Sequence, residues 1–232
     1  MKKTIITQGS KGGIGKTTIA TCICDYYAQR EIAAAVYDFD SENKANSGLQ
    51  YFYPDAKKID IRKRDGLDAL LEEIENEDNQ IIFADMGAGR GAETHEWFSA
   101  VAGELSDITE LVTLAIVTPD PASVTAALEW GKALQNKCKY VVVKNEQETE
   151  NADFSFYEKN AAAFRKAAKP EELLFRSINP ELQTALRTTG ETLAQVASGT
   201  APQTKGLRWK VRAQAILKPF FEQIEKASLL NP

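Results

Sequence analysis

The chain has 232 residues, 43% of them hydrophobic and 26% charged, and its 28 basic and 33 acidic side chains give a formal net charge of −5. This composition is typical of a globular protein, so it excludes wholesale disorder and argues against wholesale affinity for nucleic acid. With one histidine, three cysteines and no signal-peptide or membrane-helix pattern, the sequence predicts a soluble, cytoplasmic protein without a conventional zinc site or stable membrane insertion.

Short apolar runs alternate with longer helical patterns along the chain, which is typical of a parallel sheet covered by helices. Because no linker divides the chain, we expect a single α/β domain over residues 1–232. The predicted strands span residues 4–8, 33–38, 59–61, 81–85, 111–118, 140–144 and 173–176. The predicted helices span residues 15–30, 66–77, 91–105, 121–136, 155–168, 179–197 and about 207–228, the last docked on the domain.

A loop rich in glycine and lysine joins the first predicted strand to the first helix. Glycine lets a backbone wrap closely around anionic oxygens, and the helix that follows directs its positive end at them. The loop fits the phosphate-binding signature G-x-x-x-x-G-K-[ST], except that Ser10 replaces the first glycine. In that signature the lysine bridges the β- and γ-phosphates, and the Thr hydroxyl is offered to Mg²⁺. The expected nucleotide-binding residues here are Lys11, Gly12, Gly13, Ile14, Gly15, Lys16, Thr17 and Thr18.

The segment Lys11–Thr18 resembles the deviant Walker A box of the ParA/MinD ATPases. Lys16 matches the invariant loop lysine of that family, and Lys11 matches its signature lysine. The resemblance implies a doubly wound P-loop NTPase domain with a mainly parallel central sheet flanked by helices. It also implies an ATP-bound homodimer in which Lys11 reaches the partner's phosphates, as an arginine finger supplied in trans does.

Acidic residues end two of the predicted strands, at the sheet edge where open α/β proteins bind ligands. Asp38-Phe39-Asp40 resembles the first switch of the same family, which implies that Asp40 orients the attacking water and Asp38 organises the magnesium shell. Turn formation at the strand end is the alternative role for both aspartates. Asp85 fits a Walker B strand that holds a Mg²⁺-bound water. The expected metal-site residues are Thr17, Asp38 and Asp85, and the expected catalytic residues are Lys11, Lys16 and Asp40.

The residues at the end of the predicted strand 140–144 indicate which nucleotide base the protein binds. Guanine-specific P-loop proteins of the Ras type have Asn-Lys-x-Asp at this place, and Lys144-Asn145-Glu146-Gln147 does not match that pattern. In the ParA/MinD family an asparagine at this strand end contacts adenine. The resemblance therefore implies that Asn145 binds the base, and that ATP with Mg²⁺ is favoured over GTP. It also implies a second base-side loop at 176–180.

Two segments are rich in basic residues. The first, 57–64, surrounds a short strand, and such charges protect a sheet edge from aggregation. The second, 205–218, mixes lysine and arginine with apolar residues, as a terminal helix docked on the domain would. Non-specific contact with DNA phosphates is the functional alternative for the second segment. A membrane-surface helix is disfavoured because Pro219 interrupts the pattern.

Together, these features predict an ATPase that uses ATP-dependent dimerisation and hydrolysis as a molecular switch, with slow turnover stimulated by an unidentified protein partner. The resemblance suggests plasmid partition, mobilisation, conjugative transfer or the positioning of a cellular cargo. The alternatives are an ATP-dependent metabolic enzyme of the ligase or reductase kind, and a nucleotide-binding module with little turnover. Lys11 weighs against the metabolic enzyme, as does the lack of cysteines between Asp85 and Lys137.

Overall fold

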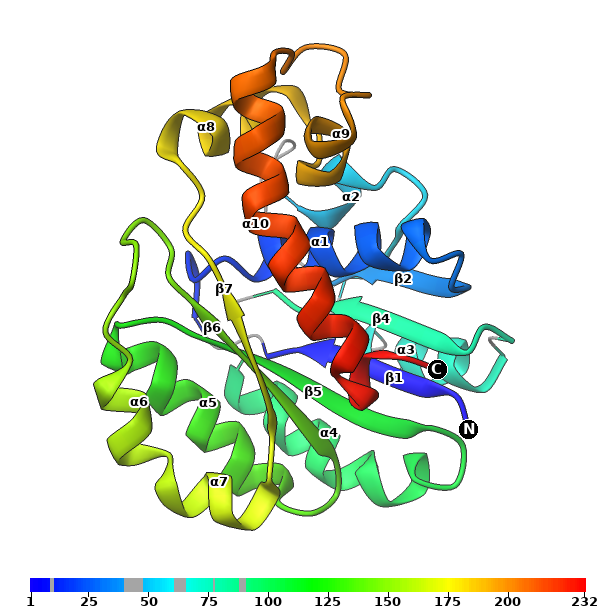
Figure 1. Cartoon of the computed structure of the whole chain (residues 1–232). Helices are drawn as coiled ribbons and strands as arrows, with labels where there is room; N and C mark the ends of the chain where they lie inside the picture. Colours follow the sequence, from blue (N-terminus) through cyan, green and yellow to red (C-terminus); the bar gives the residue numbers. More distant parts are fainter. Residues whose placement is uncertain (9–10, 40–47, 61–65, 77, 88–90) are drawn as a thin grey trace.

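The computed structural model describes residues 1–8, 11–39, 48–60, 66–76, 78–87 and 91–232 (Figure 1). Its strands are β1 (Lys3–Thr7), β2 (Ala34–Asp38), β3 (Lys57–Lys58), β4 (Ile81–Asp85), β5 (Glu110–Val117), β6 (Lys139–Asn145) and β7 (Glu171–Phe175). Its helices are α1 (Lys16–Gln29), α2 (Leu49–Phe52), α3 (Gly66–Asn76), α4 (Gly91–Leu105), α5 (Pro121–Leu134), α6 (Ser155–Asn160), α7 (Ala162–Ala168), α8 (Pro180–Thr189), α9 (Leu193–Ser198), α10 (Leu207–Lys226) and the 3₁₀ turn η1 (Ser228–Leu230).

The described strands form one sheet in the order β3-β2-β4-β1-β5-β6-β7, and all of the neighbouring strands pair in parallel. The predicted α/β fold with a central sheet flanked by helices is therefore confirmed. β1 lies in the middle, and the chain moves from it first to β2 on one side and later to β5 on the other. The carboxyl ends of β1, β2, β4, β5 and β6 consequently lie at one edge, where a doubly wound sheet binds its ligands.

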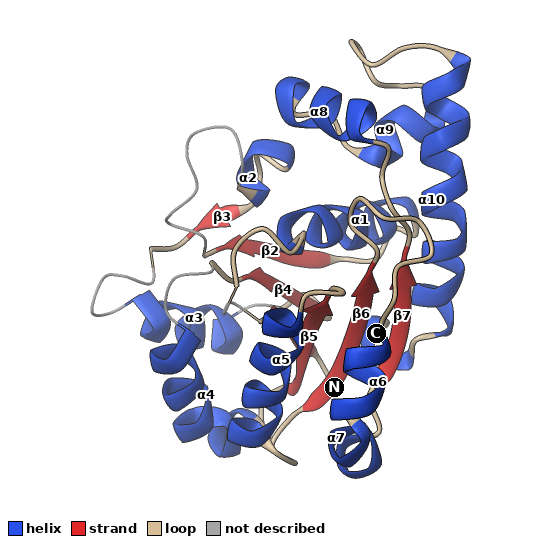
Figure 2. Ribbon diagram, turned by 90° about the vertical axis from the view of Figure 1, so that its left-hand side faces the viewer, coloured by secondary structure: helices blue, strands red, loops and turns tan. Residues whose placement is uncertain are grey.

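Each face of the sheet packs against its own set of helices, because successive residues of a strand point to opposite faces. Ile5 belongs to the cluster formed with α1, α8, α9 and α10, whereas its neighbour Ile6 belongs to the cluster formed with α3, α4 and α5. Figure 2 shows α1 and α10 on one side of the sheet and α3, α4 and α5 on the other. The absence of polar alternation in the central strands follows from this burial on both faces.

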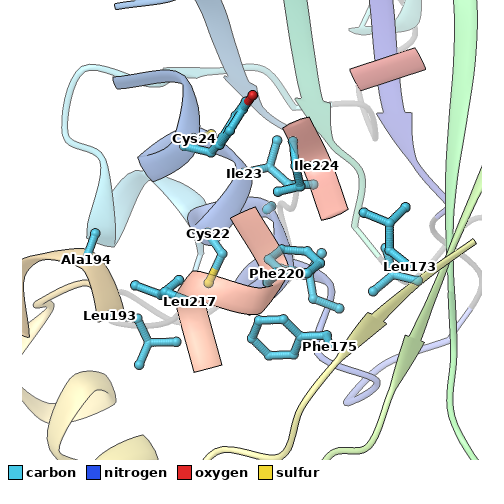
Figure 3. Close-up of a cluster of buried hydrophobic side chains, with 14 of the residues drawn as sticks. Cys22, Ile23, Cys24, Leu173, Phe175, Leu193, Ala194, Leu217, Phe220 and Ile224 are labelled. Atoms are coloured by element: carbon cyan, nitrogen blue, oxygen red, sulfur yellow. The ribbon is translucent and has the colours of Figure 1, made fainter. Parts of the chain in front are cut away.

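Both cysteines of the first helix are buried, on different sides of α1. Cys22 lies close to Leu217 and Phe220 of α10 (Figure 3), whereas Cys24 lies on the side of α1 that faces Val36 and Tyr53. Burial raises the pKa of both thiols well above the ordinary value, so they stay protonated at neutral pH. The two cysteines therefore act as small apolar side chains in the packing of α1.

Three predicted elements differ from the structure. Residues 59 and 60 of the strand predicted at 59–61 are not in a strand, and residue 61 lies outside the described residues. The strand here is β3 at Lys57–Lys58, because these residues pair with the end of β2 and form an edge of the sheet. The helix predicted at 179–197 is divided into α8 and α9. Gly190 ends α8 in the left-handed conformation, with φ 72°, and Thr192 starts α9 with a capping box to Gln195.

The helix predicted at 155–168 is also divided, into α6 and α7, at Ala161. The bend allows Tyr157 to pack with Val142 of β6 while Phe164 packs on Tyr140. The hydrophobic pattern of residues 155–168 does not reveal this bend, because the bend depends on contacts with residues of β6 that are distant in the sequence.

Helix α10 packs beside β7 and α9, and Figure 1 shows it crossing the front of the molecule diagonally from the top. Five of its residues are buried: Ala213, Ile216, Leu217, Phe220 and Ile224. Its N-terminal half instead exposes Leu207 and Val211, and the guanidinium groups of Arg208 and Arg212 stack on Trp209. Among the described helices, none is long and apolar enough to cross a membrane.

Candidate functional site

The glycine-rich loop connects the carboxyl end of β1 to the start of α1. Gly13 and Gly15 have φ values of 76° and 88°, a left-handed backbone that side chains other than glycine adopt with strain. A Cβ atom at Gly15 would also lie 2.4 Å from the amide nitrogen of Asn145. The first amides of a helix have no helical partner, and no side chain of the N-cap Gly15 accepts from them. This arrangement is typical of anion-binding helix termini.

The two lysines of the loop point to different partners. Lys16 is buried, with 7% of its surface exposed, and its ammonium donates to the carbonyl oxygen of Lys11 at 2.6 Å. Lys11 is more exposed and forms an ion pair with Asp120, which caps the N-terminus of α5. The structure therefore places Lys16 inside the loop and Lys11 at its outer rim.

Two buried aspartates lie beside the loop, at the ends of neighbouring strands. Asp38 and Asp85 are aligned in the β2–β4 register, and at most 1% of either residue is exposed. Asp85 accepts hydrogen bonds from the hydroxyls of Thr7 at 2.8 Å and Thr17 at 3.0 Å. Asp38 accepts one from the backbone amide of Gln50 at 3.0 Å. The sequence-predicted group of Thr17, Asp38 and Asp85 is thus brought together in space.

The environment of Asp85 changes its proton affinity. Burial raises the pKa of this carboxyl to about 6, although the Thr7 hydroxyl and the positive charge of Lys16 oppose the rise. The nearby negative charge of Asp38 raises the pKa of Asp85 further. A divalent cation beside these two carboxylates would lower the pKa of Asp85 and stabilise its charged form.

The donors at this edge suit Mg²⁺ bound together with phosphates. Among the described residues, no group of three or more His, Cys, Asp or Glu side chains could hold a metal ion by itself. Mg²⁺ in nucleotide sites takes only one or two protein oxygens and completes its shell with phosphates and water. The hydroxyl of Thr17 and the carboxylates behind it fit that limited role.

A cleft of about 410 Å³ opens between the phosphate loop and the ends of β6 and β7. Gly13, Gly15, Asn145, Phe175 and Ile178 are among the residues that line it. The expected base-side residue Asn145 and the expected loop at 176–180 therefore meet at one cavity. A nucleoside attached to phosphates at the loop would extend into this space.

The side chain of Asn145 contacts the phosphate loop directly. Its amide nitrogen donates to the carbonyl oxygen of Ile14 at 2.8 Å, and its oxygen accepts from the backbone amide of Gln147 at 3.0 Å. Gln147 in turn donates through its side chain to the carbonyl oxygen of Gly13 at 2.9 Å. Gln147 is a further residue of the site, and in the sequence only its position two residues after Asn145 marks it.

Two other residues at the site were missed. Thr7 holds Asp85 and also accepts from the amide of Met86 at 2.7 Å, and the pattern at the end of β1 gives no sign of this. Asp120 could have been noticed, because Asp-Pro at the start of a helical pattern is a helix-start signal. The expected catalytic residue Asp40 lies outside the described residues, as do Ser10 and Arg90.

Comparisons with known proteins agree with this geometry. A model of the CobQ/CobB/MinD/ParA nucleotide-binding domain matches residues 5–212. The fold is similar to that of the MinD cell division protein of Aquifex aeolicus, with a TM-score of 0.54 and 17% identity over 97% of this chain and 98% of that one. It is also similar to the signal recognition particle 54 kDa protein of Aeropyrum pernix in complex with GDP, with a TM-score of 0.50 and 16% identity over 92% of this chain and 57% of that one. No curated protein sequence matches significantly.

Proposed function

Because this chain belongs to the CobQ/CobB/MinD/ParA nucleotide-binding domain family, we propose that it is an ATPase whose ATP-dependent dimerisation and hydrolysis act as a molecular switch. One observation carries the proposal: a phosphate loop with lysines at both of its ends lies next to Thr17 and two buried strand-end aspartates. Nucleotide binding needs the loop, phosphoryl transfer needs the carboxylates and Mg²⁺, and dimerisation uses the outer lysine.

In the proposed mechanism the amides of the loop and of the first turn of α1 bind the phosphates of ATP. Lys16 exchanges the carbonyl oxygen of Lys11 for the β- and γ-phosphate oxygens, a short movement because the two groups belong to one loop. Thr17, whose hydroxyl donates to Asp85, would offer that hydroxyl to a bound Mg²⁺, and Asp85 and Asp38 would hold water molecules around it. When bound, Mg²⁺ supplies neutralisation of the charge on the β- and γ-phosphates.

Two further roles rest on the family resemblance. Asp40 orients the water that attacks the γ-phosphate, and Lys11 leaves Asp120 and reaches the phosphates of a second copy of the chain. The dimer thereby brings an additional cation to each site, where negative charge develops during phosphoryl transfer. Turnover is slow in the isolated protein and is stimulated by a protein partner in the cytoplasm. Plasmid partition or mobilisation, or the positioning of a cellular cargo, is the proposed setting.

The preference for ATP is proposed from Asn145 and the cleft beside it. Asn145 has one amide hydrogen and one oxygen lone pair left after its two internal hydrogen bonds. These groups match the acceptor and donor on the Watson–Crick edge of adenine. The alternative of DNA binding rests on the exposed cations of α10, Arg208 and Arg212, which could neutralise phosphates without reading the base sequence.

Size exclusion and phosphate release with ATP and Mg²⁺ test the switch. The wild type is expected to dimerise only with ATP and to release phosphate. Lys16→Ala should lose nucleotide binding, because it removes the cation that bridges the β- and γ-phosphates. Lys11→Ala should bind ATP with nearly normal affinity but remain monomeric, because two triphosphates would then face each other without their bridging cations.

The result separates the alternatives. A Lys11→Ala dimer as abundant as that of the wild type at saturating ATP would exclude the role in trans and the dimer switch with it. Turnover that requires a small-molecule substrate and occurs in a monomer would indicate a metabolic enzyme instead. Binding without release of phosphate would leave a nucleotide-binding module. DNA is tested separately, by the salt dependence of its binding to the ATP-bound protein.

A further inference from the structure

Two side-chain amides, one from the last residue of β6 and one from the loop that follows it, hold two consecutive carbonyl groups of the phosphate loop. Asn145 donates to Ile14 at 2.8 Å, and Gln147 donates to Gly13 at 2.9 Å. A trans peptide is planar, with its carbonyl and its N–H pointing in opposite directions. Fixing the Gly13 carbonyl therefore fixes the N–H of Ile14, and fixing the Ile14 carbonyl fixes the N–H of Gly15. Both N–H groups are then directed away from the loop after β6, as phosphate binding requires.

The loop that carries Gln147 is itself held in place. Gln147 adopts a left-handed backbone, with φ 56°, and its own amide donates to Asn145 at 3.0 Å. The preceding carboxylate, Glu146, is 3% exposed and accepts from the amides of Asn151 and Ser177, both at 3.1 Å. The first of these bonds closes the loop, and the second ties it to the start of the 176–180 segment. The backbone at Gln147 is thus already fixed, so holding Gly13 costs side-chain entropy at Gln147 but little further backbone entropy.

We propose that Gln147 is a positioning residue for phosphate binding, which acts through the Gly13 carbonyl to orient the Ile14 amide. The inference deepens the proposed function and rests on it, because it assigns the orientation of the phosphate loop to a side chain of the base-side loop. The two halves of the nucleotide site are consequently coupled. When the base of a nucleotide binds against residues 145–149, it also stabilises the conformation of the loop that binds the phosphates of that nucleotide.

The expected effect is moderate, because the hydrogen bond from Gln147 to Gly13 is exposed to solvent. A single neutral hydrogen bond of this kind corresponds to a change in affinity from about two- to about tenfold. The bond to Ile14 remains when Gln147 is changed, so phosphate binding should weaken without being lost.

Two substitutions separate the hydrogen bond from the backbone conformation. Gln147→Met keeps the length of the side chain and removes its donor. Gln147→Asn keeps an amide and suits the left-handed backbone, but it is one methylene too short to reach Gly13. Gln183→Met is the matched control, because Gln183 lines the same cleft from α8 rather than from the loop after β6. None of these residues belongs to the catalytic set.

The first measurement is amide hydrogen exchange of the segment 11–18 in the nucleotide-free, full-length protein. Both Gln147 variants should exchange faster in this segment than the wild type, and Gln183→Met should not. The second measurement is ADP affinity by calorimetry, which should fall two- to tenfold in both Gln147 variants. Thermal unfolding of each variant identifies any general loss of stability.

The outcomes are distinct. Unchanged exchange of segment 11–18 in both Gln147 variants overturns the inference, including the case in which ADP binds more weakly, since Gln147 would then act on the base alone. Faster exchange throughout the protein, equal to that of Gln183→Met, also overturns it. A wild type that binds no nucleotide would end the proposed function, while the exchange measurement would still decide whether Gln147 holds the loop.

Discussion

Lys11 forms an ion pair with Asp120 of its own chain, although the proposed dimer needs this lysine at the site of a partner. The carboxylate of Asp120 also accepts from the amide of Ala122 at 2.9 Å and so caps α5. The hydrogen bond from Lys11 lowers the pKa of Asp120, which keeps this acid ionised and available to the lysine. In the proposed dimer, one such pair has to break in each subunit.

We predict that Asp120→Ser promotes the ATP-bound dimer. Serine retains an N-cap for α5 but lacks the charge, so Lys11 is released without unfolding of the helix. The dissociation constant of the dimer at saturating ATP should fall a few-fold, since ion pairs at the surface are weak. Analytical ultracentrifugation measures it. A dimer weaker than that of the wild type would mean that Asp120 takes part in the interface itself.

Asp120→Asn serves as the control for this prediction. It also keeps the cap and removes the charge, so it should behave like the serine variant. If only one of the two variants dimerises more strongly, the effect comes from the shape of the side chain and not from the release of Lys11.

At the scale of elements, β7 forms an edge of the sheet, and α10 provides hydrogen bonds that a further strand would otherwise make. The side-chain oxygen of Gln223 accepts from the amide of Leu174 at 2.7 Å, and its nitrogen donates to the carbonyl oxygen of Leu174 at 3.0 Å. One glutamine thus pairs both backbone groups of a residue in the edge strand. This contact protects the edge from pairing with another chain.

We predict that Gln223→Leu destabilises the protein by about 1–3 kcal/mol, because two partly buried backbone groups lose their partner. The free energy of unfolding is measured by urea denaturation. Gln214→Leu on the same helix is the control. Its side chain makes an exposed hydrogen bond to the carbonyl oxygen of Ala197, and the loss should stay within roughly 0.5 kcal/mol. Equal losses in the two variants would show that β7 does not depend on Gln223.

At the scale of the whole molecule, one buried carboxylate connects three parts of the chain. Asp25 of α1 accepts from the hydroxyls of Tyr53, after α2, and Thr192, before α9, the latter at 3.1 Å. It also accepts from the amide of Ala194 at 3.4 Å. Burial raises the pKa of this carboxyl from 3.8 to about 6, and the three hydrogen bonds only partly oppose the rise.

The sign of the pH dependence follows from this shift. Between pH 4 and 6 the folded protein retains a proton on Asp25 that the unfolded chain releases, so the free energy of unfolding falls as the pH rises through this range. We predict that Asp25→Asn, which cannot ionise, gains stability relative to the wild type between pH 4.5 and pH 7. The gain should be about 2 kcal/mol.

Urea denaturation of both proteins at the two pH values provides the test. Asp85 also has a raised pKa, but its contribution is common to wild type and variant and cancels in the difference. If the difference in stability between the two proteins is the same at both pH values, Asp25 ionises at its ordinary pKa in the folded state.

The features that could be predicted are those that depend on residues close together in the sequence. The strand, the glycine loop and the helix from residue 3 to residue 29 are continuous, so their pattern already indicated a phosphate site. Asp38 and Asp85 were recognised because each directly follows an apolar run. Their meeting in space follows from parallel strands that end at the same edge.

The features that could not be predicted depend on contacts between distant segments. The pair Lys11–Asp120 joins residues 109 positions apart, and the bond from Asn145 to Ile14 joins residues 131 positions apart. Gln147, Gln223 and Asp25 are ordinary polar residues in their own segments. Their roles arise from backbone groups and hydroxyls that other elements bring to them. The local spacing of residues indicates which groups lie at one edge of the sheet. The packing of the elements decides which partner each polar side chain has. The reason is that a buried polar group is stabilised only by the hydrogen-bonding group that lies against it in the fold.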